Sequence, residues 1–504
     1  MSVRQAGAPG EIWGAAEFPP LLDAVRQAVG GRGEVYLVGG AVRDAYLRRP
    51  VSDLDFVGTG DGIELGQHVA RSLQAAFYPL DTERRVGRVL VESAGRRLTL
   101  DFSSLRGKRL IEDLAARDFT VNAVALPLAD LSTAIDPLGG LDDLRLKTLR
   151  ACTPGALADD PLRTLRAVRL AVQLEFRIEP ATRELIRAAA AGLPQVAAER
   201  VRDEFMRIMG GTRVAPALRV MQALGLLALV VPETAGLERV AQPPPHIHDV
   251  WNHTLLLIDR LESLLAVLAP QADEDSSADL VFGLASVRLG RFRESLKAHL
   301  TRTLSGDRPV RGLTFLGALL HDVGKPETRG VDSQGEVHFL GHDSLGGDWA
   351  VRRAGLLHLS NIEADYLGGI VRLHMRPQHL AHDGPPSRRA VYRFFAAAGE
   401  CGVDVCLISL ADMLAIYGPT LSQDSWAAML DTIRSLLESF FEHPAEHIHP
   451  PLLLTGDEVM QALGLHPGPQ VGFLLEALRE AQAAGEVTAR EAALEFVRTR
   501  RAQS

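Results

Sequence analysis

The first 150 residues alternate short apolar runs with helical patterns, and the rest of the chain is patterned almost wholly as helix. Strands are predicted where Val, Leu and Phe cluster in short runs bounded by turn residues. These runs are Val35–Val38, Leu54–Val57, Val89–Glu92 and Leu98–Phe102. An amphipathic helix is predicted near the end of residues 1–30, after a polar start. The pattern therefore predicts an α+β unit followed by all-α regions.

Breaks in the helical pattern divide the chain further. A length of 504 residues exceeds what one hydrophobic core supports and predicts roughly three or four units. The proline-rich run Gln242–Pro245 marks one boundary, and the acidic stretch Gln271–Ser277 is predicted as an exposed loop. The predicted organisation is an N-terminal extension (1–30), an α+β head (31–150), a helical neck (151–240), a second helical domain (246–425) and a helical tail (426–504).

Two short stretches of the head carry chemistry. Gly39 and Gly40 follow an apolar run, so they lie in a strand-to-helix turn where backbone N–H groups can approach a phosphate. Asp53 and Asp55 are two residues apart in a strand-like run, so both point to the same face of the sheet. Paired carboxylates of this kind bind a hard cation. Together these features predict Mg²⁺-dependent phosphoryl or nucleotidyl transfer.

The same stretches belong to a longer series of motifs. The chain contains LVGGAVRDAYL…SDLDFV, then EDLAARDFTVNAVAL (Glu112–Leu126), DPLGGLDDL (Asp136–Leu144), DDPLRTLRAVRLA (Asp159–Ala171) and ERVRDEFMRIM (Glu199–Met209). In content, order and spacing this series resembles the class II tRNA CCA-adding enzymes and bacterial poly(A) polymerases. The resemblance implies a polymerase-β-like nucleotidyltransferase head, an RNA-binding neck, and tRNA, CTP and ATP as substrates.

The resemblance also implies roles for particular residues. Catalytic roles fall to Asp53, Asp55 and Asp101, the first two as Mg²⁺ ligands. Nucleotide contacts fall to Gly39, Gly40, Arg43, Arg117, Asp118, Asn122, Asp160, Arg163 and Arg166. Asp160 and Arg163 resemble the pair that imitates the edge of a templating base, which requires both acceptor and donor groups. Simpler interpretations stay open: Asp160–Pro161 is typical of a helix N-terminus, and Arg43 and Asp44 are typical of a local ion pair.

One interval is shorter than in CCA-adding members of this family. In those proteins a flexible loop separates the strand with the third carboxylate from the EDL…RDFT motif, whereas here only Ser103–Ile111 fill the interval. In the family the loop is associated with the switch from adding C to adding the terminal A, and CC-adding members lack it. The short interval therefore predicts efficient addition of C, with the terminal A added slowly or not at all.

A second constellation lies in the helical part of the chain. His321 and Asp322, in LLHDVGK, resemble the HD phosphohydrolase signature, in which adjacent His and Asp bind a divalent ion. The resemblance implies further ligands at His253 and Asp412, and a second metal position completed by His342 and His374. Imidazole and carboxylate ligands suit a transition metal such as Mn²⁺, Fe²⁺, Ni²⁺, Co²⁺ or Zn²⁺ better than Mg²⁺. A domain kept only for its structure is the alternative. The other histidines of this region are predicted to face solvent: His246, His248, His338 and His379.

Charge and composition limit the remaining choices. The net charge of −9 argues against RNA binding overall, but arginines cluster in the neck at positions such as Arg163, Arg166 and Arg169, which predicts local RNA contact. The three cysteines form no disulfide framework, and no signal peptide or long apolar window is evident, so a cytoplasmic protein with no membrane partner is expected. The rival interpretations are a poly(A) polymerase, and an HD-type metal phosphohydrolase with a nucleotide-binding head. The oligomeric state is not predicted.

Overall fold

The structure is a computed structural model that describes residues 3–5, 19–51, 53–93, 96–271, 279–382 and 384–502. The polar start at residues 6–18, Ser52 and the predicted acidic loop at 272–277 lie outside the described residues. The chain divides into two compact units. The first comprises residues 1–196 with 224–226, and the second comprises 197–223 with 227–504. The division falls within the predicted neck, and the run Gln242–Pro245 lies inside the second unit.

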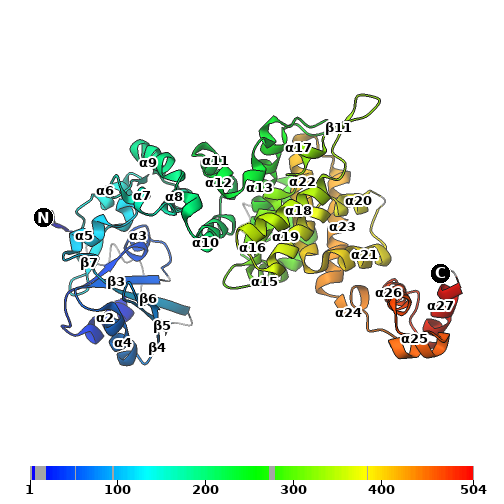
Figure 1. Ribbon diagram of the computed structural model, residues 1–504, viewed down its shortest axis with the longest axis horizontal. Coiled ribbons are helices and arrows are strands. Elements are labelled where there is room, and N and C mark those ends of the chain that lie inside the picture. The colour runs from blue at the N-terminus through cyan, green and yellow to red at the C-terminus, as the bar shows by residue number, and fades with distance from the viewer. Residues whose placement is uncertain are drawn as a thin grey trace. The chain divides into compact units, whose positions relative to one another are not determined.

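A mixed eight-stranded sheet forms the centre of the first unit (Figure 1). In spatial order its strands are β1 (Val3–Gln5), β8 (Thr133–Ile135), β7 (Ala125–Pro127), β2 (Val35–Val38), β3 (Asp53–Gly58), β6 (Arg96–Ser104), β5 (Val86–Ser93) and β4 (Ala76–Asp81). Strands β3 and β6 pair in parallel, and the other pairs are antiparallel. The sheet core includes Phe56 and Phe102, whose stacked rings lie 4.8 Å apart. All four predicted strands are confirmed.

Helices pack on this sheet and follow it in the chain. The helices of the first unit are α2 (Pro19–Val29), α3 (Gly40–Tyr46), α4 (Gly62–Ser72), α5 (Leu110–Ala115), the 3₁₀ turn η1 (Thr120–Asn122), α6 (Gly140–Arg145), α7 (Ala156–Asp159), α8 (Arg163–Leu174) and α9 (Pro180–Ala190). Helix α4 packs against β5 and β6, and α2 packs on α4. Helix α2 is the amphipathic helix expected near the N-terminus, with Leu22 and Val25 buried.

The second unit is almost wholly helical (Figure 1). Its helices are α10 (Ala198–Met209), α11 (Val214–Ala223), α12 (Leu227–Val230), α13 (Val250–Val267), α14 (Leu280–Leu289), α15 (Arg293–Thr301), α16 (Val310–Leu320), α17 (Lys325–Thr328), α18 (His342–Leu356), α19 (Asn361–Leu373), α20 (Arg376–Ala381), α21 (Arg388–Ala398), α22 (Gly402–Tyr417), α23 (Gln423–Phe441), α24 (Pro444–His447), α25 (Gly456–Leu463), α26 (Pro469–Ala483) and α27 (Arg490–Ala502). Helix α13 packs along α22, and α18 along α19.

One stretch of this unit, Arg388–Thr420, is long and apolar enough to cross a membrane by length and composition. Sequence analysis predicted no such stretch. Its most apolar window is 78% buried inside the protein, as expected of a helix that serves as a core element. Cys401 and Cys406 lie in it as buried free thiols.

The last three helices share a core of their own, which includes Leu454, Leu474 and Val497. Helix α25 begins with a capping box in which Thr455 and Glu458 bond each other's backbone N–H groups. Residues 464–468 connect α25 to α26.

Candidate functional sites

Strand pairing brings three carboxylates of the head onto one face of the sheet. Asp55 on β3 is in register with Asp101 on the parallel neighbour β6, and Asp53 lies two residues before Asp55 on the same face. Burial raises the pKa of the Asp55 carboxyl; Arg117 lowers it, but Asp101 and Asp53 raise it further. A buried carboxylate beside two others is an oxygen donor that a hard divalent cation stabilises. The residues present therefore fit Mg²⁺.

Gly39 presses the backbone of the turn against this cluster. Its φ of 77° lies in the left-handed region, and a Cβ added there would lie 3.1 Å from Asp55 Oδ2 and 3.2 Å from Arg117 Nη1. Only glycine combines this backbone conformation with so close an approach. The turn that sequence analysis predicted to bind phosphate therefore contacts the carboxylate cluster directly.

A cavity of 260 Å³ opens at this point. Nine of the predicted residues line it: Gly39, Gly40, Arg43, Asp53, Asp55, Arg117, Asp118, Asn122 and Arg166. Its other lining residues were not predicted as site residues: Ala41, Asp44, Pro50, Val51, Arg169 and Leu170. Arg169 could have been found, because it continues the three-residue spacing of Arg163 and Arg166 along α8. Asp101, Asp160 and Arg163 are predicted residues that do not line the cavity.

The cavity wall is held by paired side chains. Arg43 donates to Asn122 Oδ1 at 2.7 Å and to both carboxylate oxygens of Asp44 at 2.9 and 2.7 Å. The local ion pair considered for Arg43 and Asp44 is therefore present. Arg117 donates to the buried Asp113 at 3.0 Å. These bonds fix two guanidinium groups at a wall that also carries the glycine turn.

Asp118 and Arg166 form a second pair, with Arg166 Nε 2.9 Å from Asp118 Oδ2. Asp118 also accepts hydrogen bonds from Asn122 Nδ2 at 3.0 Å and from the Phe119 N–H at 2.8 Å. Burial by itself would raise the pKa of Asp118, but Arg166 and these hydrogen bonds outweigh it, so the pKa is lowered. Asp118 is therefore an ionised acceptor at the cavity wall.

Asp160 and Arg163 have other surroundings. Helix α8 is assigned from Arg163, but Leu162 already has helical dihedral angles, Asp160 is extended, and the Asp160 carbonyl oxygen accepts from the Arg163 N–H at 3.0 Å. The interpretation of Asp160–Pro161 as a helix start therefore stays open. The Arg163 guanidinium donates to the carbonyl oxygens of Ala116 at 2.9 Å, Ala156 at 2.9 Å and Arg117 at 3.3 Å. It thereby supports the segment that carries Arg117 and Asp118, and its base-reading role stays a prediction.

In the second unit, the six predicted metal ligands come together from five parts of the fold. His253 lies on α13, His321 and Asp322 follow α16, His342 begins α18, His374 follows α19 and Asp412 lies on α22. Local signals position them. Asp249 caps α13, a Ser360–Glu363 capping box starts α19, and Gly324 lets the backbone approach the His342 carbonyl, where a Cβ would lie at 2.3 Å.

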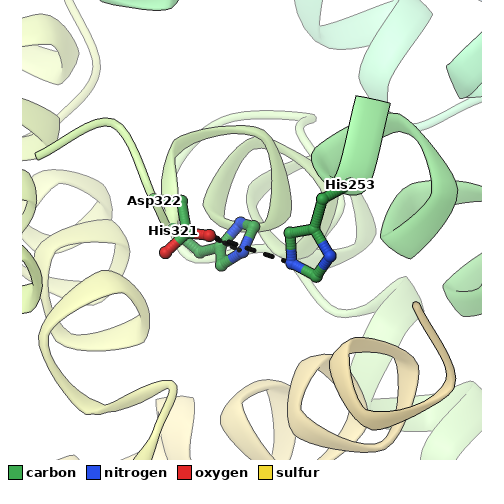
Figure 2. Close-up of side chains that lie close together, drawn as sticks. All are labelled: His253, His321 and Asp322. Atoms are coloured by element: carbon green, nitrogen blue, oxygen red, sulfur yellow. Dashed lines mark ion pairs between the residues drawn. The ribbon is translucent and has the colours of Figure 1, made fainter. Parts of the chain in front are cut away.

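Asp322 lies at the centre of this cluster, and Figure 2 shows His253 and His321 beside it. Its carboxylate oxygens lie 3.0 Å from His321 Nε2, 3.4 Å from His342 Nε2, 3.8 Å from His253 Nε2 and 3.9 Å from His374 Nε2. His253 Nε2 is also 3.0 Å from Asp412 Oδ1. The ligand atoms form two groups, His253–His321–Asp322 and Asp322–His342–His374, that share the carboxylate of Asp322.

The hydrogen bonds of the rings leave the inner nitrogens free for a metal. His321, His342 and His374 each place Nδ1 at 2.7–2.8 Å from the carbonyl oxygen three residues earlier, which directs Nε2 inward as in known metal-binding histidines. Five buried atoms of this cluster form ion pairs at most and no hydrogen bond of ordinary geometry: His253 Nε2, His321 Nε2, His342 Nε2 and both oxygens of Asp322. Buried polar atoms are normally bonded, so this donor set fits metal ions.

Opposed charges shift the pKa values of these groups. Burial opposes ionisation of Asp322, but His321 and Lys325 hold its pKa well below the usual range. Burial would lower the pKa of His321, but Asp322 outweighs it and raises it. Burial and the neighbouring His321 lower the pKa of His374 to about 4. His374 is therefore a neutral ligand near neutral pH.

Sequence reasoning missed the groups that surround this cluster. Lys325 Nζ lies 2.7 Å from Asp322 Oδ2 and donates to Gln242 Oε1 at 2.6 Å, and Gln378 donates to Asp412 at 2.6 Å. The ring of His246 packs edge-on against His253 at 5.2 Å. His246 and His338 are half-buried, so their prediction as solvent-facing residues is wrong; His248 and His379 are exposed as expected. The sequence contained a sign of Lys325, because this residue is the last of the HDVGK motif.

Comparison with known proteins places these sites in context. Residues 35–150 match a family described as "Poly A polymerase head domain", and residues 175–237 match one described as "Probable RNA and SrmB- binding site of polymerase A". The chain is 35% identical to an A-adding tRNA nucleotidyltransferase of Deinococcus radiodurans, covering 92% of this chain and 94% of that protein. It is 33% identical to a CC-adding tRNA nucleotidyltransferase of Thermus thermophilus, covering 92% and 93%.

Solved structures agree on the fold. A CCA-adding enzyme in complex with ATP aligns with a TM-score of 0.61 at 18% identity, covering 96% of both chains. A Thermotoga maritima CCA-adding enzyme with tRNA aligns with a TM-score of 0.57 at 18% identity, covering 99% of both chains. The predicted architecture, a nucleotidyltransferase head with a mixed sheet followed by a mostly helical region, is confirmed.

Proposed function

The chain belongs to the tRNA nucleotidyltransferase family, and from this membership we propose that its head transfers CMP from CTP to the 3′ end of tRNA. The observation that carries the proposal is the face formed by Asp53, Asp55 and Asp101 beside the Gly39 turn, because it combines a cation site with a phosphate site. A head that only binds ligand has no need for three converging carboxylates. The arginines of the neck supply the phosphate contacts for RNA.

Groups that line the cavity, and predicted residues that do not line it, each have a task in this proposal. Asp53, Asp55 and Asp101 would hold divalent ions, which supply the positive charge that favours attack by the RNA 3′-hydroxyl and departure of pyrophosphate. The backbone N–H groups of the glycine turn, with Arg43 and Arg117, would bind the triphosphate. Asp160 and Arg163 would present acceptor and donor groups to the base of the incoming nucleotide. The activity takes place where tRNA and nucleotides occur, which supports a cytoplasmic location.

Specificity for C is proposed from the connection between β6 and α5. Strand β6 ends at Ser104 and α5 begins at Leu110, so residues 105–109 alone connect them. A connection this short offers little length for a lever that repositions the base-reading groups for a larger purine. Relatives of both specificities are similar to the chain, so the assay must decide. A tRNA that lacks its 3′ end, incubated with each labelled nucleotide separately, should incorporate label from CTP and little from ATP, GTP or UTP.

A second function is proposed for the helical unit, where an HD-type dinuclear site would hydrolyse a phosphate ester. The observation that favours it is the convergence of buried histidine nitrogens on the carboxylate of Asp322, in two groups that could each hold a metal ion. Six histidine and carboxylate side chains suit a transition metal such as Mn²⁺ or Zn²⁺. The test is metal content by mass spectrometry, followed by hydrolysis of 2′,3′-cyclic nucleotides with each metal. A protein that retains no transition metal and shows no hydrolysis would leave this region as a structural HD fold.

A further inference from the structure

Arg88 faces the carboxylate cluster from strand β5. It is in register with Asp101 on the antiparallel neighbour β6, which is in turn in register with Asp55 on β3. Residues in register on neighbouring strands lie on the same face of a sheet. Arg88, Asp101 and Asp55 therefore form one row across three strands, and the positively charged guanidinium of Arg88 lies at one end of this row.

The guanidinium of Arg88 engages both oxygens of Asp101. Nε donates to Oδ1 and Nη2 to Oδ2, each at 2.7 Å, in the parallel two-bond geometry that arginine forms with carboxylates. The pair is mostly shielded from water, with side chains 30% and 18% exposed. These hydrogen bonds raise the pKa of Arg88 above its already high value. Arg88 is therefore a permanent cation at this position.

A divalent ion and this guanidinium need the same oxygens. An ion bound by Asp55 and Asp101 takes an oxygen of Asp101 that also accepts from Arg88. Each carboxylate oxygen has two lone pairs, so the ion and the hydrogen bond share that oxygen and each weakens the other. The two positive charges would also repel each other at short range. Arg88 is not among the residues that line the nucleotide cavity, and its guanidinium donates to both oxygens of Asp101, so it acts on the site through Asp101.

We propose that Arg88 is a positioning residue that hydrogen-bonds to the third carboxylate, Asp101, in the substrate-free enzyme. Asp101 then becomes a metal ligand only when the nucleotide arrives with its own cation. The proposal rests on the proposed nucleotidyl transfer at this site. In the resting enzyme the fork of Arg88 holds Asp101 in one orientation and weakens binding of free metal. With a nucleotide bound, the triphosphate charge offsets the repulsion and Asp101 can share its oxygens.

The test measures metal binding without any reaction. Mn²⁺ binding is followed by electron paramagnetic resonance in the absence of nucleotide, in proteins that also carry His321→Ala and Asp322→Ala so that the second unit binds no ion. Arg88→Met removes the positive charge and both hydrogen bonds to Asp101, with little change in side-chain volume. Arg88→Lys keeps the charge but loses the fork. Arg84→Met is the matched control, because Arg84 lies on the same hairpin, is 77% exposed and pairs with Asp81.

Removal of the nearby charge should tighten binding of free Mn²⁺ about tenfold in Arg88→Met, with the Coulomb gain discounted for partial exposure. Arg88→Lys should tighten it about threefold, and Arg84→Met should leave it unchanged. In the native HD background, Arg88→Met should lower kcat for nucleotide addition about tenfold or more, because Asp101 loses its fixed orientation. The KM for CTP should stay within about twofold, because Arg88 does not line the cavity.

Unchanged or weaker Mn²⁺ binding in a folded Arg88→Met protein overturns the proposal. If thermal unfolding shows that Arg88→Met is not folded, the same comparison in Arg88→Lys decides, because that variant retains the ion pair. If Mn²⁺ binding tightens as expected but the native protein adds no nucleotide to tRNA, the role of Arg88 stands and the proposed function fails. The two ideas are therefore tested separately.

Discussion

Gly39→Ala tests whether the glycine turn and the carboxylate cluster form one site. The left-handed φ of 77° costs an alanine roughly 1–2 kcal/mol in the native state. The new Cβ would also lie 3.1 Å from Asp55 Oδ2, so Asp55 or Arg117 must move by a few tenths of an ångström. Misplacement of reacting groups by about 1 Å can cost about a hundredfold in rate. We therefore expect kcat to fall about tenfold to a hundredfold.

Gly40→Ala is the matched control for stability. Gly40 is not among the glycines with positive φ, and a Cβ there would lie 3.4 Å from Arg43 Nη2, an ordinary van der Waals distance. Its melting temperature should equal that of the native protein or exceed it, because alanine favours helix. The assay is steady-state addition of labelled CMP to tRNA, with thermal unfolding measured in parallel. Turnover by Gly39→Ala within threefold of the native rate would refute the contact between the turn and Asp55.

Three further predictions concern the two sites. Asp53→Ala or Asp55→Ala should lower the rate of nucleotide addition by about three decades or more, because the metal charge that stabilises the transition state is lost. Binding of tRNA, measured in a filter assay, should stay nearly intact. Near-normal turnover would contradict the head assignment. His321→Ala or Asp322→Ala should remove bound transition metal and any phosphohydrolase activity while sparing nucleotide addition, and loss of both activities together would contradict the independence of the two sites. Because the pKa of Asp118 is lowered in the folded head, its ionised form stabilises the head above the ordinary Asp pKa of about 4, and this contribution is lost as pH falls through the lower folded value. Arg166→Met should therefore reduce the loss of thermal stability on acidification, and an unchanged acid limb of the melting curve would count against the pair.

The local pattern of apolar and polar residues predicted four strands of the head. It failed for elements whose formation depends on tertiary pairing. The four predicted strands are rich in Val, Leu and Phe, and they were found. Strand β4 was missed because most of its residues are exposed and it contains Pro79, and β7 and β8 were missed because three residues give no readable alternation. The division of the chain after Val196 was also missed, since no break in composition accompanies it.

In the two sites, residues that lie in sequence motifs were named from the sequence, whereas residues brought in by tertiary contacts were missed. In the second unit, the six predicted ligand side chains, from five parts of the fold, lie close together: four histidines surround Asp322, and Asp412 contacts His253. Arg88 was not found, since its partner Asp101 becomes visible only when β5 is paired with β6 in register. Gln242 was taken for part of a linker, but its amide oxygen accepts from Lys325 inside the second unit. Contacts of this kind depend on the whole fold, and the sequence carries no local sign of them.

The most direct measurement for the central claim is the sequence of product ends. A tRNA that lacks its 3′ end is incubated with the enzyme, CTP and ATP together, and the 3′ termini are sequenced. The account predicts ends that carry two added C residues, with the terminal A rare, because residues 105–109 are too short to shift the base-reading groups. Efficient CCA ends would contradict the proposed specificity, and ends without any added C would contradict CMP transfer by the head.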